Sequence, residues 1–112
     1  NMKRTSTPVG IEEISTPGQV ANFELFSNYP NPFNPETSIR FSLNEGGRTT
    51  LKIFNIIGQV VRTLVDEDLS TGTFEVRWNG RDTANNSVAS GVYLYRLENN
   101  GAYQTRRMML LK

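Results

Sequence analysis

The stretch "NYPNPFNPETSIRFSL", residues 28–43, places three prolines within six positions, directly before a run that alternates apolar and polar residues. Proline fixes φ, lacks an N–H and drives the residue before it toward extended backbone. Residues 29–35 are therefore predicted to form a stiff corner that is neither helix nor central strand. In the run that follows, Ile39, Phe41 and Leu43 share one face, which is the period of a half-buried strand. The stretch predicts a rigid corner that leads into a sheet.

Segments of the same kind recur on both sides of this stretch. Turn signals separate them about every 8–12 residues, β-branched and aromatic residues are frequent, and no helical period occurs. The acidic cluster Asp66-Glu67-Asp68 is predicted to lie in a turn, and Asn99-Asn100-Gly101 is a strong hairpin signal because Asn-Gly tolerates positive φ. Seven strands are predicted: 23–25, 38–43, 48–55, 60–65, 74–78, 91–98 and 102–111.

The segment "ASGVYLY", residues 89–95, refines this fold class. In immunoglobulin domains a tyrosine turns a corner two positions before a cysteine, and its hydroxyl bonds back to the upstream backbone. Tyr93 takes the corner position here, and Tyr95 stands where the cysteine would be. The sequence thus predicts an all-β fold, a seven-stranded antiparallel immunoglobulin-like β-sandwich.

The composition of the chain limits the classes of function that it can have. The chain has 112 residues, enough for one domain, and 12 basic against 11 acidic side chains give a formal charge of +1. This balance predicts no electrostatic attraction to nucleic acid or anionic membrane. Cysteine and histidine are absent, which removes thiol chemistry and the commonest general base and metal ligand. The longest apolar run, residues 108–111, is far shorter than the roughly 20 residues of a membrane helix, so no membrane insertion is expected.

The remaining candidate sites for ligands are weak. The loop at residues 79–86 offers oxygen ligands but lacks the acidic spacing of an EF-hand, so a turn is favoured over a calcium site. Trp78 and Phe74 could form a carbohydrate platform, but their alternation with Glu75 and Arg77 favours core packing. The sequence predicts a protein that is not an enzyme and has no cofactor or metal.

Four blocks of sequence, taken together and in order, carry a family resemblance. They are "FELFSNYPNPFNPETSIRFSL", "LKIFNIIGQVVRTLVD", "WNGRDTANNSVASGVYLYRLE" and "RRMMLLK". The chain resembles the type A C-terminal sorting domain of type IX secretion, which ends many exported proteins of the Bacteroidetes. It is also similar to the immunoglobulin-like module of flagellar hook-capping proteins. The resemblance implies that residues 1–22 are a flexible linker from an upstream cargo domain and that residues 23–112 are the sorting domain.

The resemblance also implies a function. The domain would direct its cargo from the periplasm across the outer membrane, to the cell surface or the medium, and a sortase would then remove it. Its partners would be the outer-membrane translocon, the sortase and the upstream cargo; seven strands and an aromatic core predict a monomer. The residues expected to matter for recognition are Pro30, Asn31, Pro32, Phe33, Asn34, Pro35, Gly91, Tyr93, Arg106, Arg107, Met108, Leu110 and Lys112.

Alternatives remain open from the sequence. The chain could be a carbohydrate-binding or adhesive sandwich attached to a secreted enzyme, or a structural module of a flagellar hook cap. The final strand could be a recognition element or simply a strand that is buried on both faces, because its apolar residues occupy successive positions. The proline corner could orient the linker or only stabilise the fold.

Overall fold

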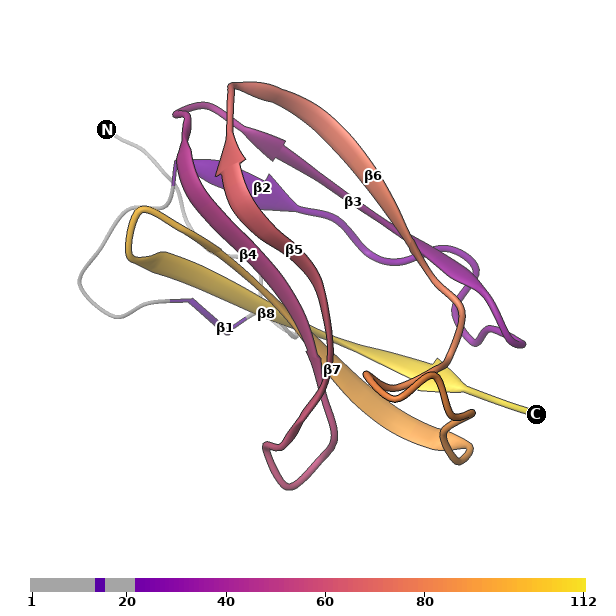
Figure 1. Ribbon diagram of the computed structural model, residues 1–112. Helices are drawn as coiled ribbons and strands as arrows, with labels where there is room; N and C mark the ends of the chain where they lie inside the picture. Colours follow the sequence, from indigo (N-terminus) through magenta and orange to yellow (C-terminus); the bar gives the residue numbers. More distant parts are fainter. Residues whose placement is uncertain (1–13, 16–21) are drawn as a thin grey trace.

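A computed structural model describes residues 14–15 and 22–112 of the chain. Two antiparallel sheets face each other across one core (Figure 1), with strand order β1-β8-β7-β4-β5 in the larger sheet and β2-β3-β6 in the smaller. No helix long and apolar enough to cross a membrane occurs in this part of the chain. The strands are β1 (Ile14–Ser15), β2 (Phe23–Leu25), β3 (Thr37–Leu43), β4 (Gly47–Phe54), β5 (Val60–Leu69), β6 (Gly72–Trp78), β7 (Gly91–Asn99) and β8 (Ala102–Leu110).

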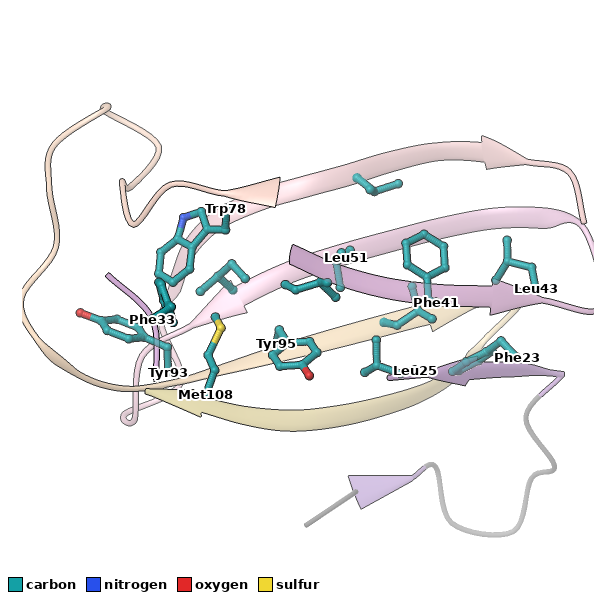
Figure 2. Packing of buried hydrophobic residues seen from close by; sticks show 14 of the residues in the cluster. Phe23, Leu25, Phe33, Phe41, Leu43, Leu51, Trp78, Tyr93, Tyr95 and Met108 are labelled. Atoms are coloured by element: carbon teal, nitrogen blue, oxygen red, sulfur yellow. The ribbon is translucent and has the colours of Figure 1, made fainter. Parts of the chain in front are cut away.

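Alternation along the strands builds the core. In β3, Ile39 and Phe41 are fully buried, and in β4 Leu51 and Ile53 are fully buried on the facing sheet. The residues between them face outward, as period-two side-chain geometry requires. Burying these side chains supplies the main stabilisation of the sandwich, at about 1.5–3 kcal/mol for each large apolar side chain. Figure 2 shows Trp78 at one end of this core and Phe23 at the other.

The predicted seven-stranded sandwich is confirmed, since the predicted strands correspond to β2 through β8. The predicted hairpin between the last two strands is also confirmed. Asn100 and Gly101 have φ values of 55° and 88°. Such positive values are the ones that Asn and Gly adopt most readily in a two-residue hairpin turn. Asn99 then pairs with Ala102 across the turn.

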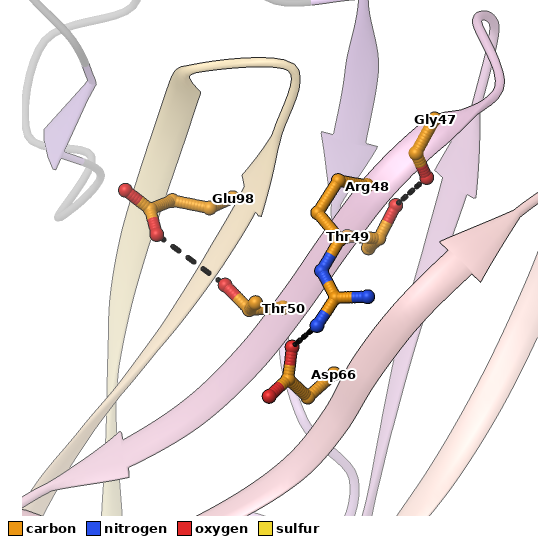
Figure 3. Close-up of polar contacts among 6 residues, drawn as sticks. All are labelled: Gly47, Arg48, Thr49, Thr50, Asp66 and Glu98. Atoms are coloured by element: carbon orange, nitrogen blue, oxygen red, sulfur yellow. Dashed lines mark hydrogen bonds and ion pairs between the residues drawn. The ribbon is translucent and has the colours of Figure 1, made fainter.

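The prediction of a turn at residues 66–68 was wrong. β5 continues through the acidic cluster to Leu69, and Asp66 pairs with Thr50 of β4. The physical reason is that β5 is an edge strand of the sheet, where outward carboxylates stay solvated. Arg48 on β4 forms an ion pair with Asp66, as Figure 3 shows, so the neighbouring strand also supplies a counter-charge.

The short strand β1 was not predicted. Ile14 pairs with Thr105 and Ser15 with Gln104, so this segment adds a fifth strand to the larger sheet, beside β8. It lies within the predicted linker, residues 1–22. The rest of that linker, residues 1–13 and 16–21, lies outside the described residues.

Candidate recognition site at the proline corner and the terminal strand

The proline corner is a loop that is closed at its base. The backbone N–H of Tyr29 donates to the carbonyl of Ser38 and the N–H of Ser38 donates back to Tyr29, both at 2.9 Å. Inside this closure, the Thr37 hydroxyl donates to the Pro30 carbonyl at 2.9 Å, and the Asn28 amide nitrogen donates to Thr37 Oγ1 at 3.0 Å. The three prolines thus sit in a loop with a fixed exit, which is the start of β3.

The same loop reaches across to the end of the chain. The N–H of Phe33 donates to the carbonyl of Met109, and the N–H of Leu111 donates to the carbonyl of Phe33, each at 3.0 Å. Asn31 Oδ1 accepts the N–H of Met109 at 3.0 Å. These groups lie on the edge of β8 that β7 leaves open, and an uncovered edge would invite pairing with another chain. The corner therefore covers the edge of the terminal strand.

Phe33 fixes the corner to the core through its ring. It is 2% exposed, and its ring centroid lies 5.7 Å from that of Trp78, which in turn lies 5.5 Å from Tyr93 in an edge-to-face contact. Figure 2 shows these three rings gathered at one end of the core. The Tyr93 hydroxyl donates to the Ala89 carbonyl at 2.7 Å, which is the bond predicted for a tyrosine corner. Gly80 permits the close approach of the next loop, because a Cβ there would lie 3.1 Å from the Pro35 carbonyl oxygen.

The terminal strand has one buried and one exposed face. Met108 and Leu110 are 2% and 0% exposed, whereas Met109 and Leu111 are 38% and 49% exposed. The alternative of a strand buried on both faces is therefore wrong. Beside Met109 lies a shallow depression of about 260 Å³, which Asn31, Val92 and Arg107 also line.

The two charged ends of the predicted terminal block differ in their surroundings. Arg106 is half-buried; its Nε donates to the Leu25 carbonyl at 2.8 Å and its guanidinium to Ser27 Oγ at 3.3 Å, which ties β8 to β2. Lys112 is exposed, its N–H donates to Ser90 Oγ at 3.0 Å, and its ammonium donates to Ser87 Oγ at 2.5 Å. Arg106 thus contributes to the fold, and Lys112 lies at the surface.

Sequence reasoning missed the role of Tyr95 beneath the corner. Its hydroxyl donates to the Phe26 carbonyl at 2.8 Å and accepts the N–H of Asn28 at 2.9 Å. Burial raises the pKa of Tyr95 to about 12, although the bond from Asn28 and the charge of Arg106 act in the lowering direction. The only signal in the sequence was the position of Tyr95, where an immunoglobulin domain has its cysteine. Because Asn28 and Tyr95 are far apart in the chain, no local pattern joins them.

The structure brings most of the predicted recognition residues to one end of the sandwich. Gly91 opens β7 and pairs with Leu110, and Leu110 forms a bridge with Phe33 of the corner. Pro30, Pro32, Asn34 and Pro35 are exposed on the loop around Phe33. Arg106 alone is set apart, beside β2.

The structure also bears on the two ligand sites considered from the sequence, a carbohydrate platform and a metal site. Trp78 is 1% exposed and its indole N–H donates to the Arg81 carbonyl at 2.9 Å, while Phe74 is stacked on Phe41 with centroids 5.3 Å apart. Trp78 is a core residue and Phe74 packs against the core, so the two rings do not form an exposed carbohydrate platform. In residues 14–15 and 22–112, no three acidic side chains lie close enough together to hold a metal ion.

Comparison with known proteins identifies the family to which this architecture belongs. Residues 31–102, more than half of the chain, match the family model described as the FlgD Ig-like domain. Among curated proteins no relative matches the chain.

Several solved structures share the fold. Dimeric latent PorU from Porphyromonas gingivalis is similar with a TM-score of 0.65 and 17% identity, over 80% of this chain and 9% of PorU. PorZ of the same organism, described as an essential bacterial surface component of the type-IX secretion system, has a TM-score of 0.57 and 27% identity, over 79% of this chain and 11% of PorZ. FlgD from Pseudomonas aeruginosa has a TM-score of 0.54 and 14% identity, over 80% of this chain and 75% of FlgD. The chain thus spans only about a tenth of the PorU and PorZ chains, and it belongs to the FlgD Ig-like domain family.

Proposed function

We propose that this chain is a non-catalytic sorting domain that directs an attached cargo protein across the outer membrane by type IX secretion, to the cell surface or the medium. The observation that carries the proposal is the display of the terminal strand. Its inner face and one edge are held by the core and the proline corner, and its outer face offers Met109 and Leu111 to a receptor. The similarity to a part of PorZ, which its description places in the type-IX secretion system, supports the same reading.

The fixed frame has a physical consequence for recognition. A strand end that is already ordered loses little conformational entropy when a receptor binds it, so more of the contact energy remains as affinity. The prolines and the bonds of Asn31 and Phe33 supply this order. The corner and the terminal strand would therefore act as one unit, with the corner in the role of support.

The test uses the alternation along β8. A reporter with an N-terminal Sec signal and residues 1–112 at its C-terminus is expressed in a type IX-competent host. The double variant M109S/L111S changes half-exposed positions, so it should lower the unfolding free energy by only about 1.5–3 kcal/mol and leave the domain folded, yet the reporter should stay in the periplasm. The variant M108A/L110A should be exported poorly for a different reason, because each truncation in the core costs about 2–5 kcal/mol.

A matched control is available on the other sheet. Thr73 and Glu75 are exposed on β6, and T73A/E75A should be exported like the unchanged domain. Mass spectrometry of the exported reporter should find a C-terminus upstream of Phe23 if a sortase removes the domain. Efficient export of M109S/L111S would contradict the role given to the terminal strand. Retention of the unchanged reporter would contradict the sorting function itself.

Family membership also favours a second candidate, a structural module of a flagellar hook cap. The identity to FlgD is 14%, which supports the fold alone, against 27% to PorZ. The gene context separates the two, since a hook-cap module would lie among flagellar genes and a sorting domain would follow a secreted cargo. The alternative of an adhesive module rested on an exposed aromatic platform, and Trp78 is buried.

A further inference from the structure

The tip of the β4–β5 hairpin presents two adjacent isoleucines to solvent. Ile56 and Ile57 are 72% and 74% exposed, and Val60 beside them is 51% exposed. In Figure 1 this hairpin projects beyond the rest of the sandwich. Exposed apolar side chains that gather at one protruding point are typical of interaction sites. We propose that this tip, residues 55–60, is a docking knob for an apolar pocket with an acidic rim on a protein of the secretion machinery, an inference that rests on the proposed function.

The tip is held rigid by its own backbone. The N–H of Asn55 donates to the Gln59 carbonyl and the N–H of Gly58 donates to the Asn55 carbonyl, both at 3.0 Å. Asn55 Oδ1 accepts the N–H groups of Ile57 at 3.1 Å and of Gln59 at 2.9 Å. Four hydrogen bonds within the turn thus fix its backbone, and both isoleucine side chains remain exposed. Such preorganisation lowers the entropic cost of docking into a pocket.

The surroundings of the tip supply further contact surface. An open groove of about 590 Å³ runs between the hairpin and the loop at residues 79–90. Val60, Val61 and Val88 line it together with the polar residues Gln59 and Thr83. The acidic Asp82 also lines the groove, and its carboxylate accepts the N–H of Asn86 at 2.9 Å. A partner that encloses the knob could extend a rim into this groove, which is the arrangement of a central apolar anchor within a polar border.

The charges on this chain near the tip indicate which charge the partner's rim should carry. The register of the larger sheet sets Lys52 opposite Arg96, and Leu94 opposite Arg107, on the half of its outer face nearest the tip. The carboxylates of this sheet's outer face lie on the other half, where Asp66, Asp68 and Glu98 pair with positions 48–50. The outer face of the larger sheet is therefore basic on the half toward the tip and acidic on the far half. A complementary partner carries carboxylates around its apolar pocket.

Two other occupants are less favoured. A whole myristoyl chain gives only marginal, reversible membrane binding, and two isoleucine side chains offer less apolar surface than that. Upstream cargo is an unsuitable cover, because Asn22 lies at the opposite end of the sandwich, where its carbonyl accepts the N–H of Asn44 at 2.8 Å. The tip instead lies at the end where β7 begins, since Phe54 pairs with Leu94.

The experiment replaces both isoleucines in the exported reporter. I56S/I57S should unfold at the same urea concentration as the unchanged domain, because both side chains are exposed, yet its export should fall roughly tenfold or more, as for loss of a central anchor. The matched control is S70A/T71A in the exposed turn at the opposite end of β5, which should leave export unchanged. K52E should lower export by a smaller factor, because it reverses one rim charge.

Each contrary result has a distinct meaning. If the unchanged reporter is exported and I56S/I57S is exported equally well, the docking knob is wrong and the sorting function stands. If the unchanged reporter is retained, the proposed function fails. Co-flotation of the purified domain with phosphatidylglycerol vesicles that is lost in I56S/I57S would overturn the proposal in favour of a lipid surface. A dimer in sedimentation that I56S/I57S dissolves would overturn it in favour of a second copy.

Discussion

At the scale of single residues, two tyrosines on β7 make hydrogen bonds to different parts of the chain. Tyr93 closes the corner before β7 by donating to Ala89. Tyr95 is fully buried and joins β7 to the segment that precedes the prolines, through Phe26 and Asn28. Burial raises the pKa of both phenols, and that of Tyr95 to about 12. The free energy of unfolding should therefore fall as the pH rises through the alkaline range.

The prediction for Tyr95 concerns the window between pH 10 and 12. The unfolded phenol ionises near its ordinary pKa of about 10, whereas the folded phenol keeps its proton up to about 12. Its contribution is thus fully present below pH 10 and is lost as the pH rises through 12, by about 2–3 kcal/mol. Urea unfolding of the unchanged domain at stepped pH should show this fall.

The matched variant is Tyr95→Phe. At neutral pH it should be about 1–3 kcal/mol less stable, because the buried N–H of Asn28 loses its acceptor. Between pH 10 and 12 its free energy of unfolding should fall less than that of the unchanged domain. Equal slopes for the two proteins would show that Tyr95 is not the titrating group.

At the scale of elements, the proline corner and the end of β8 form one unit. Phe33 joins them twice, by its backbone bonds to Met109 and Leu111 and by its ring against Trp78. Asn31 adds a third link to Met109. The rigid corner that the sequence predicted therefore covers the edge of the terminal strand.

Phe33→Ala should cost about 3–5 kcal/mol of stability, because it leaves a cavity in the core. It should also speed hydrogen exchange at the Leu111 amide beyond what the global loss explains, since the loop that accepts this N–H is no longer anchored. Phe23→Ala is the control, because Phe23 is equally buried but lies at the other end of the core. Equal acceleration at Leu111 in both variants would refute a local role for the corner.

At the scale of the whole molecule, the sandwich has exposed sheet edges to protect. β5 is an edge strand of the larger sheet, and Asp66, Glu67 and Asp68 lie near its C-terminal end. Charges on an edge oppose pairing with another chain, because the carboxylates would have to be desolvated or brought together. We propose that the acidic cluster opposes association of the domain through this edge.

This role gives a prediction for the oligomeric state. The unchanged domain should sediment as a monomer at micromolar concentration, and D66T/E67T/D68T should associate through β5, because threonine keeps the strand propensity and removes the charges. Arg48→Thr, which removes the partner of Asp66 but leaves the cluster, should stay monomeric. A monomeric triple variant would show that the cluster does not guard this edge.

Much of the fold was visible in local sequence. Alternation located the strands, Asn100-Gly101 located the hairpin, and the two-residue spacing from Tyr93 to Tyr95 located the tyrosine corner. These features depend on neighbours within a few residues, so a single chain reveals them. The acidic stretch of β5 was misjudged because its strand character comes from pairing with β4, and not from its composition.

For the candidate site, the sequence by itself determined which segments are unusual: a rigid proline corner, and a terminal strand with apolar residues at successive positions. Only the tertiary structure decided that the two meet, that Met108 and Leu110 are buried while Met109 and Leu111 are exposed, and that Arg106 is bonded to β2. The bonds that decide this join groups such as Asn31 and Met109, which lie 78 residues apart. Bringing such distant groups together costs loop-closure entropy, which only the packing of the two sheets on one another offsets, and no local pattern of side chains records that balance.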